Sequence, residues 1–195
     1  MSIQIHHGLP DRLRSDAARL YWQAFGGKLG RVLGPDPLAY ALLARVMRGD
    51  HAIVALSEDG ALLGLVGFKS PAGAFAGGEF GDLRAVYGTV GALWRAGLLW
   101  LLERDLDNDR FLMDGICVAD TARGQGVGTA LLDAICAEGR ARGYPSVRLD
   151  VIDANPRARA LYERQGFVAT RTSKIGALRW VFGFSAATTM VRALV

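Results

Sequence analysis

Apolar residues alternate with polar ones, or form short apolar runs bounded by turn residues, in seven segments of the chain. Such segments are typical of β-strands. The predicted strands are Ile3–His6, His51–Leu56, Leu62–Phe68, Phe111–Val118, Val147–Ile152, Phe167–Thr172 and Ala187–Leu194. The second and third are joined across Asp59-Gly60, a two-residue hairpin signal, so we expect these two strands to be antiparallel neighbours.

Other segments repeat their apolar residues with the period of an α-helix, which places those residues on one face. The predicted helices are Asp11–Phe25, Pro37–Met47, Leu83–Leu102, Gly126–Arg142 and Pro156–Arg164. Hairpins mixed with strand-helix-strand units indicate an α/β (α+β) fold. We expect one domain over residues 1–195, with a mixed, mostly antiparallel sheet of about seven strands and helices on both faces.

The helical segment 83–102 is unusually apolar, yet it contains Arg84 and Arg95. A charge near the middle of a membrane helix costs about 2.5 to 3.5 kcal/mol on insertion scales, so a membrane span is disfavoured. The Gly-rich run before it, GAFAGGEFGD at residues 73–82, predicts a mobile loop. The helix itself would line a binding pocket, form a homodimer interface or cover the sheet, and the sequence leaves these three alternatives open.

Composition narrows the class of protein. Hydrophobic residues make up 51% and charged residues 22% of the chain, which indicates a folded globular protein. The net charge of +4 comes from scattered arginines, so nucleic-acid binding is disfavoured, although an anionic ligand is allowed. Cys117 and Cys136 lie in apolar runs, and the N-terminus lacks the apolar core of a signal peptide, so we expect a reduced, cytoplasmic protein.

The most informative stretch is ARGQGVGTALL at residues 122–132, which follows a predicted strand and begins a predicted helix. Backbone N–H groups at a helix start have no intrahelical partner, and the helix dipole makes that end positive. Glycine at 124, 126 and 128 would let a phosphate approach those donors, with Arg123 adding a charge at the rim. The alternative is a flexible turn with a close helix-strand contact.

Two other phosphate-binding motifs fit this stretch less well. A dinucleotide fingerprint needs G-x-G-x-x-G after the first strand of a Rossmann unit, although Asp150 at the end of the next strand lies near the distance of its acidic residue. A Walker A loop is excluded because no Gly-Lys-Ser/Thr follows.

Three separate segments together resemble the GCN5-related N-acetyltransferase (GNAT) superfamily. Residues 123–128, RGQGVG, fit the family's acetyl-CoA signature R/Q-x-x-G-x-G/A in full. The strand before it ends at Val118, five residues before Arg123, which is the family's usual offset. The stretch from Asn155 resembles N-x-x-A-x-x-x-Y-x-x-x-G-F, with Asn155, Ala158, Tyr162, Gly166 and Phe167 in place. The resemblance is clear from about Phe111 to Val168.

The resemblance implies acetyl-CoA as cosubstrate and assigns the residues that bind it. The pyrophosphate would lie on the glycine turn, and the pantetheine arm would pair with the end of the preceding strand, where the backbone N–H near Val118 would polarise the thioester. The cofactor-binding residues expected on this basis are Ile116, Cys117, Val118, Arg123, Gly124, Gln125, Gly126, Val127, Gly128, Thr129, Asn155 and Tyr162. Asn155 would also cap its helix before Pro156.

The resemblance also implies a direct transfer of the acetyl group to an amine. Tyr162 matches the family position that protonates the departing thiolate. The general base does not carry over; Asp114, expected to share a strand face with Ile116 and Val118, is our candidate, and Glu79 and Asp82 are alternatives. His6, His7 and His51 show no triad or metal spacing, so no metal is expected.

The sequence thus predicts an acetyl-CoA-dependent N-acetyltransferase acting on a small-molecule or peptide amine. A CoA-binding sensor or interaction module without turnover is the alternative from a different class, and a Rossmann-type oxidoreductase is the third. The identity of the acceptor is not in the sequence.

Overall fold

The sheet is the centre of the protein, for which the computed structural model describes residues 2–102 and 110–194. Seven of the described strands follow the order β1-β2-β3-β5-β6-β8-β7, and a short β4 pairs with β3. Their bounds are β1 Gln4–His7, β2 Ala52–Leu56, β3 Leu62–Ser70, β4 Gly73–Ala74, β5 Phe111–Val118, β6 Ser146–Ile152, β7 Val168–Lys174 and β8 Ala186–Ala193. Among them only β5 and β6 are parallel, which confirms the mixed, mostly antiparallel sheet.

Helices fill the gaps between the strands where the 3.6-residue period predicted them. Their bounds are α1 Arg14–Leu33, α2 Asp36–Val46, α3 Phe80–Leu102, α4 Val127–Ala141, α5 Pro156–Arg164 and α6 Arg179–Phe182, with short 3₁₀ turns at Asp11–Leu13, Gly49–His51, Asp120–Ala122 and Gly176–Leu178. The predicted hairpin at Asp59-Gly60 is confirmed, since β2 and β3 pair antiparallel across it and Gly60 has a φ of +79°. The short α6 is an element that the sequence did not predict.

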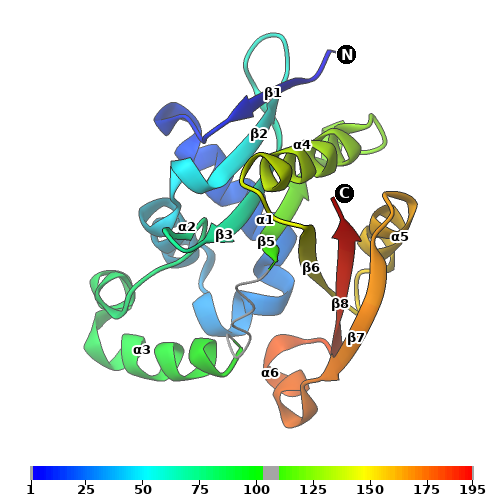
Figure 1. The fold of residues 1–195 in the computed structure, drawn as a ribbon. Coiled ribbons are helices and arrows are strands. Elements are labelled where there is room, and N and C mark those ends of the chain that lie inside the picture. The colour runs from blue at the N-terminus through cyan, green and yellow to red at the C-terminus, as the bar shows by residue number, and fades with distance from the viewer. Residues whose placement is uncertain (1, 103–109, 195) are drawn as a thin grey trace.

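Helices lie on both faces of the sheet (Figure 1). An apolar cluster fills the space between the sheet and the helices on each face. One contains buried residues of α1, α2 and α3, together with Leu65 of β3 and Cys117 of β5. The other contains the buried stripe of α4, with Leu131 and Ile135 fully inaccessible, and Tyr162 of α5. Alternate residues of each strand therefore serve different clusters, as the two-residue period of a strand requires.

Helix α1 is longer than predicted, because it continues through Gly26, Gly27 and Gly30 instead of ending at Phe25. Glycine costs about 1 kcal/mol relative to alanine inside a helix, which is why the sequence indicated an end. Tertiary packing compensates, since Val32 and Leu33 in the last turn are buried. A Cβ at Gly26 would lie 3.1 Å from the Trp22 ring, so the glycine also suits the indole beside it.

The run 73–82, predicted as a loop, contains regular structure at both ends and a buried residue between them. Gly73 and Ala74 form β4, Phe75 is fully buried, and α3 already begins at Phe80. The Phe75 N–H donates to the carbonyl of Phe68 at 3.1 Å, and the Arg48 N–H donates to the carbonyl of Phe75 at 2.9 Å. A single aromatic residue among the glycines thus anchors the segment to the sheet.

The apolar segment 83–102 is confirmed as a helix, part of α3, and Gly88 interrupts it with non-helical angles of φ 69° and ψ 174°. Leu83 and Ala92 are buried against the cluster of α1 and α2, so one side of the helix does cover the sheet domain. Val90, Leu93 and Trp100 are exposed on another side. Among the described residues, no helix has both the length and the apolar character that a membrane crossing needs.

Candidate active site

Strands β5 and β6 diverge after two residue pairs, and the gap between them forms the candidate site. Within the described chain they pair only at Phe111 with Val147 and at Leu112 with Arg148. On its other side, β5 stays paired with β3 as far as Val118. The rest of β5 therefore keeps one bonded edge and turns its other edge toward the gap, visible in Figure 1 as two diverging arms of the sheet.

A β-bulge explains where the divergence starts. The register between β3 and β5 shifts so that Gly67 pairs with Gly115 and Phe68 pairs with Met113, which leaves Asp114 as the extra residue. A bulge bends its strand and increases its twist. The bend falls just after the last pair with β6, so β5 turns away from β6 at this point.

The backbone of Ile116 and Val118 faces the gap. The Ala119 N–H donates to the carbonyl of Leu63 at 2.8 Å, and Cys117 is opposite Leu65 in the same ladder. Backbone polar groups alternate sides along a strand, so those of the residues in between point away from β3. They form an open strand edge that an extended ligand could pair with.

Helix α4 begins beside this edge without a capping side chain. Gly126 is the N-cap residue in left-handed conformation, and the first helical bond runs from the Ala130 N–H to its carbonyl at 3.0 Å. The N–H groups of Val127, Gly128 and Thr129 therefore have no intrahelical acceptor. The first turn has no acidic residue, so the positive end of the helix dipole is not neutralised from within the helix.

The three glycines of the turn have different structural reasons. Gly124 and Gly126 have φ values of +77° and +86°, which other L-residues adopt at a cost, and the space beside each is open. A Cβ at Gly128 would instead lie 3.1 Å from the Leu161 side chain and 3.9 Å from that of Val118. The third glycine thus allows α4, α5 and the end of β5 to meet closely, as in the packing alternative drawn from the sequence.

Two polar side chains of the turn fold back on the preceding 3₁₀ turn. Arg123 pairs with Asp120 at 2.6 Å and is half exposed, and the Gln125 amide donates to the carbonyl of Thr121 at 2.8 Å. These contacts stiffen the loop and leave its N–H groups as the donors available to an anion. The Val127 side chain is buried in the core, so only its backbone faces the site.

Helix α5, which carries Tyr162, packs against the glycine turn through Leu161. Asn155 caps this helix as predicted, its Oδ1 accepting from the Ala158 N–H at 3.1 Å. Tyr162 is only 6% exposed, and its ring centroid is 6.0 Å from that of Phe167. Burial, reinforced by nearby Cys117, raises the pKa of its phenol well above the ordinary value, so the hydroxyl stays protonated.

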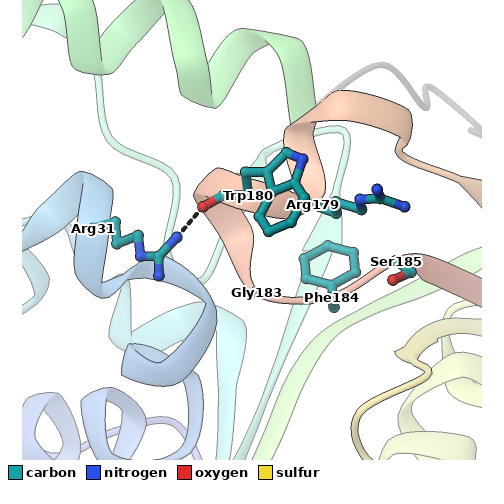
Figure 2. Close-up of a pocket in the computed structure, with 6 residues that line it drawn as sticks. All are labelled: Arg31, Arg179, Trp180, Gly183, Phe184 and Ser185. Atoms are coloured by element: carbon teal, nitrogen blue, oxygen red, sulfur yellow. Dashed lines mark hydrogen bonds between the residues drawn. The ribbon is translucent and has the colours of Figure 1, made fainter.

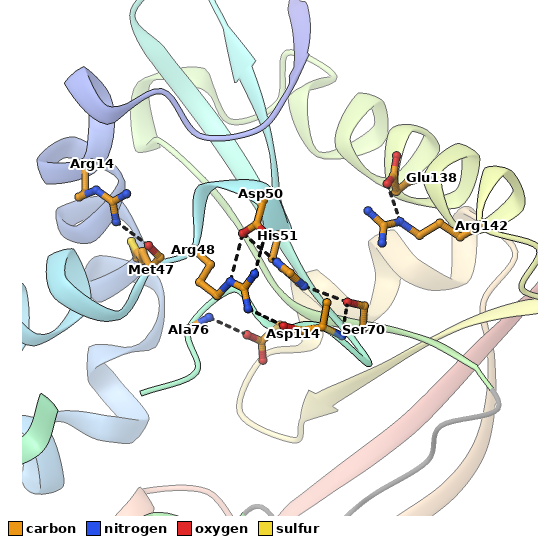
Figure 3. Close-up of polar contacts among 11 residues, drawn as sticks. Arg14, Met47, Arg48, Asp50, His51, Ser70, Ala76, Asp114, Glu138 and Arg142 are labelled. Carbon is orange, nitrogen blue, oxygen red and sulfur yellow. Dashed lines mark hydrogen bonds and ion pairs between the residues drawn. The ribbon is translucent and has the colours of Figure 1, made fainter. Parts of the chain in front are cut away.

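Asp114 lies on the opposite sheet face from the one predicted. The bulge reverses the alternation, so Ile116 and Val118 pack toward α4, whereas Asp114 faces α1. Its carboxylate accepts from the Ala76 N–H at 3.2 Å (Figure 3). The same carboxylate is 3.9 Å from Lys69 Nζ. On this face it contributes, after burial, to the raised pKa of Tyr21 on α1.

The alternative bases Glu79 and Asp82 stand at the start of α3. The Asp82 carboxylate accepts from the Glu79 N–H at 3.0 Å and pairs with Arg45 at 2.7 Å. These contacts, the backbone hydrogen bond first, hold the pKa of Asp82 below its usual range, which makes it a poor proton acceptor. Glu79 is exposed at the surface.

The structure brings together three residue types that the sequence did not connect. His51 is buried, with Nε2 at 2.9 Å from Ser70 Oγ and Nδ1 at 2.9 Å from Asp50 (Figure 3). Ser70 Oγ also accepts from the Ala72 N–H at 3.2 Å, and Arg48 both pairs with Asp50 at 2.7 Å and donates to the Ala72 carbonyl. The cluster therefore fastens the turn that leads to β4, which in turn sets Ala76 beside Asp114.

The described residues contain no group of three or more histidine, cysteine, aspartate or glutamate side chains placed to hold a metal ion. Cys117 and Cys136 are buried thiols.

Comparison with known proteins identifies the class that this geometry defines. Residues 15–167 match the Acetyltransferase (GNAT) family, and the chain belongs to that family. It is an acetyl-CoA-dependent N-acetyltransferase. The Rossmann alternative is wrong, because the glycine turn follows the fifth strand of a mostly antiparallel sheet.

Solved structures share the fold at low sequence identity. An N-acetyltransferase from Staphylococcus aureus Mu50 superposes with a TM-score of 0.67 at 15% identity, covering 96% of this chain and 99% of that one. The ribosomal-protein-S18-alanine N-acetyltransferase from Escherichia coli gives 0.60 at 15% identity, covering 99% and 94%. A Bacillus anthracis structure named for streptothricin acetyltransferase, in complex with acetyl coenzyme A, gives 0.50 at 15% identity over 73% and 61%.

Proposed function

We propose that this enzyme transfers the acetyl group of acetyl-CoA directly to a primary amine of a small molecule or peptide. The pantetheine arm would pair with the open edge of β5 at the backbone of Ile116 and Val118, with Cys117 between them. The pyrophosphate would accept hydrogen bonds from the N–H groups of the turn from Gln125 to Thr129. The side chain of Arg123 would lie at the rim of that site.

One observation carries this proposal: an unpaired strand edge and an uncapped helix N-terminus lie side by side. An extended, amide-containing chain fits the first, because it can add backbone-like hydrogen bonds to a strand. A diphosphate fits the second, because free N–H groups and the dipole favour an anion. Coenzyme A joins both groups in one molecule, and the contact of Gly128 with Val118 sets the two subsites next to each other.

The bond changes follow from this arrangement. The amine nitrogen attacks the thioester carbon, the C–N bond forms, and the C–S bond breaks with its electron pair on sulfur. The Val118 N–H would stabilise the developing oxyanion. One proton of the amine passes to a base, and the thiolate takes up one proton, which gives an amide and free CoA.

Tyr162 is the group we assign to the thiolate. Its raised pKa keeps it a donor throughout the neutral range. The pKa of a thiol is only about 8.5, so full proton transfer from this phenol is uphill. The hydroxyl therefore acts first by donating a hydrogen bond that stabilises the leaving sulfur.

Asp114 is the group we assign to the amine. It lies on the α1 side of the sheet at the bulge where β5 leaves β6, so an acceptor approaching from that side would meet it. The Ala76 N–H and Lys69 orient its carboxylate. Asp114→Asn should then remove the base while preserving the shape of the bulge.

The test is CoA release from acetyl-CoA with a panel of polyamines, aminoglycosides, amino acids and peptides. We expect acetyl-CoA to bind in calorimetry and at least one amine to release CoA, with release much reduced in Asp114→Asn. Failure to bind acetyl-CoA would overturn the proposal. Binding without release for every amine would favour the alternative of a CoA-binding sensor.

A further inference from the structure

An open hollow of about 410 Å³ lies beside α6, at the C-terminal end of α1 (Figure 2). Its lining combines basic and aromatic side chains with small residues. The lining residues are Arg31 of α1, Arg179 and Trp180 of α6, and Gly183, Phe184 and Ser185 in the segment leading to β8. None of these residues has a role in the acetyl-CoA site proposed above.

The hollow adjoins the far end of the β6 arm. Ser185 directly precedes β8, whose Ala187 pairs with Ile152 at the end of β6. The Ser185 N–H donates to the Asp153 carboxylate at 3.2 Å, just beyond that strand. This is the end of β6 at which β5 has already diverged, so the hollow stands beside the opening between the arms.

Helix α1 connects the hollow to Asp114. A Cβ added to Gly115 would lie 2.7 Å from the Phe25 ring, so this part of α1 is packed on the bulge. Arg31 follows six residues later, about 9 Å along the axis at 1.5 Å per residue. Helix α1 thus extends from the bulge beside Asp114 to the hollow at Arg31.

Among the described residues that line the hollow, the two charged ones are both arginines. Arg31 donates to the Trp180 carbonyl, and the Arg179 guanidinium lies 5.0 Å from the centroid of the Trp180 ring. Within the described part of the chain, neither arginine forms an ion pair with a carboxylate. Asp153, the nearby acid, accepts from the backbone of Ser185.

Both arginines keep donors for a ligand. A guanidinium has five N–H donors in a planar fork that matches carboxylate and phosphate. Trp180 is 70% exposed, so its ring offers an apolar surface beside those donors.

We propose that this hollow binds an anionic group of the acceptor, which makes the substrate an amine that also carries a carboxylate or phosphate. In a peptide acceptor, such a group would be the side chain of an acidic or phosphorylated residue that follows the amino terminus. This inference rests on the proposed function. It disfavours polycationic acceptors, because a second amine would meet two arginines.

The test uses three series of amidated tetrapeptides, in which the second, third or fourth residue is Asp, phosphoserine, Asn or Lys, with spermidine as a polycation. Hydrogen bonds to a charged group are stronger than those to a neutral amide, so in at least one series we expect the Asp or phosphoserine peptide to exceed the Asn peptide about tenfold in kcat/KM. The Lys peptide and spermidine should be poorer still.

Arg179→Gln should bring the Asp and Asn peptides within about twofold of each other, while KM for acetyl-CoA stays unchanged. Arg19→Gln is the matched control, since Arg19 lies on α1 in an exposed pair with Asp16 at 3.8 Å, far from the hollow. This variant should retain the preference. Thermal melting of both variants checks that α6 stays folded.

Binding of the same peptides to the CoA-bound protein, measured by calorimetry, gives a readout that does not need turnover. Equal affinity for the Asp and Lys peptides in every series, or an acidic preference that survives Arg179→Gln, overturns the inference. Loss of the proposed function is seen separately, as absence of acetyl-CoA binding in the same instrument.

Discussion

Gly126 shows how one backbone angle supports a binding site. At a φ of +86° it turns the chain into α4 and leaves the first N–H groups uncovered. Gly126→Val should weaken acetyl-CoA binding, because a branched side chain would occupy the open space in front of those donors. It should also reduce stability by about 1 to 2 kcal/mol through backbone strain.

A matched variant separates the two effects. Gly143, which follows α4 at its other end, has a φ of +79° and open space beside it. Gly143→Val should lower the melting temperature similarly and leave the calorimetric affinity for acetyl-CoA unchanged. Equal affinities in both valine variants would remove the glycine turn from the cofactor site.

Tyr162→Phe removes only the phenol hydroxyl and so tests its role as a hydrogen-bond donor. The ring packing against Phe167 is kept, so KM for acetyl-CoA should hardly change while kcat falls about 10²-fold. Because burial raises the pKa of this phenol above the unfolded value of about 10, the donor should not be lost as the pH rises toward 10. Steady-state kinetics over pH 6 to 10 measures both effects, and Tyr144→Phe is the control, expected to keep full activity.

At the scale of residues, the sequence predicted local chemistry better than spatial position. Two short motifs were predicted correctly as sequence patterns: the glycine turn at the start of α4, and Asn155 with Tyr162 on α5. The spacing within each motif depends on a single helix. The face of Asp114 could not be predicted, because it depends on a bulge that shifts the register against β3. A single extra residue reverses the side to which every later position points.

Among the elements, β4 and its neighbours show how Phe75 positions the candidate base. Phe75→Ala should cost about 3 to 5 kcal/mol of unfolding free energy, as truncation of a buried phenylalanine does. It should also lower kcat more than acetyl-CoA affinity, because the Ala76 N–H would no longer be held against Asp114.

The control is Phe68→Ala, a buried residue that faces the other apolar cluster. A similar loss of stability without the selective loss of kcat is expected there, measured by denaturant unfolding and steady-state kinetics. If both variants lose kcat equally, general destabilisation accounts for the effect of Phe75.

The apolar period of residues 83–102 predicted the helix α3. The same period fits a pocket wall, a dimer interface and a cover for the sheet equally well. Its buried side covers the domain through Leu83 and Ala92, and Val90, Leu93 and Trp100 remain exposed. A homodimer through this exposed side stays a prediction. Light scattering of the protein and of Trp100→Glu tests it, since a dimer formed there should dissociate in the variant.

At the scale of the whole molecule, the divergence of β5 from β6 predicts which backbone amides acetyl-CoA protects from hydrogen exchange. Acetyl-CoA at 100 times its Kd should stabilise the protein by about 2.7 kcal/mol. Hydrogen exchange should slow at the amides of Ile116, Val118, Gly128 and Thr129. Ala119, already bonded to Leu63, should exchange at the same rate with and without ligand; uniform protection of all five amides would contradict the proposed pairing.

Periodicity predicted part of the overall architecture, namely every described strand except β4, most helix bounds and a mixed sheet. The divergence of β5 from β6 and the hollow beside α6 were not, because both arise where segments far apart in sequence meet. Arg31 and Trp180, for example, are joined only through the packing of α1 on α6. Such contacts carry no local signal in either segment.

The burial of both cysteines gives the protein a built-in sensor of its own unfolding. Burial raises the pKa of Cys117 to about 12 and also raises that of Cys136, so neither forms the reactive thiolate in the native state. A chromogenic disulfide reagent would therefore detect CoA released during turnover against a silent protein. Added denaturant should then reveal two thiols per chain, and their appearance would trace the loss of the native sheet.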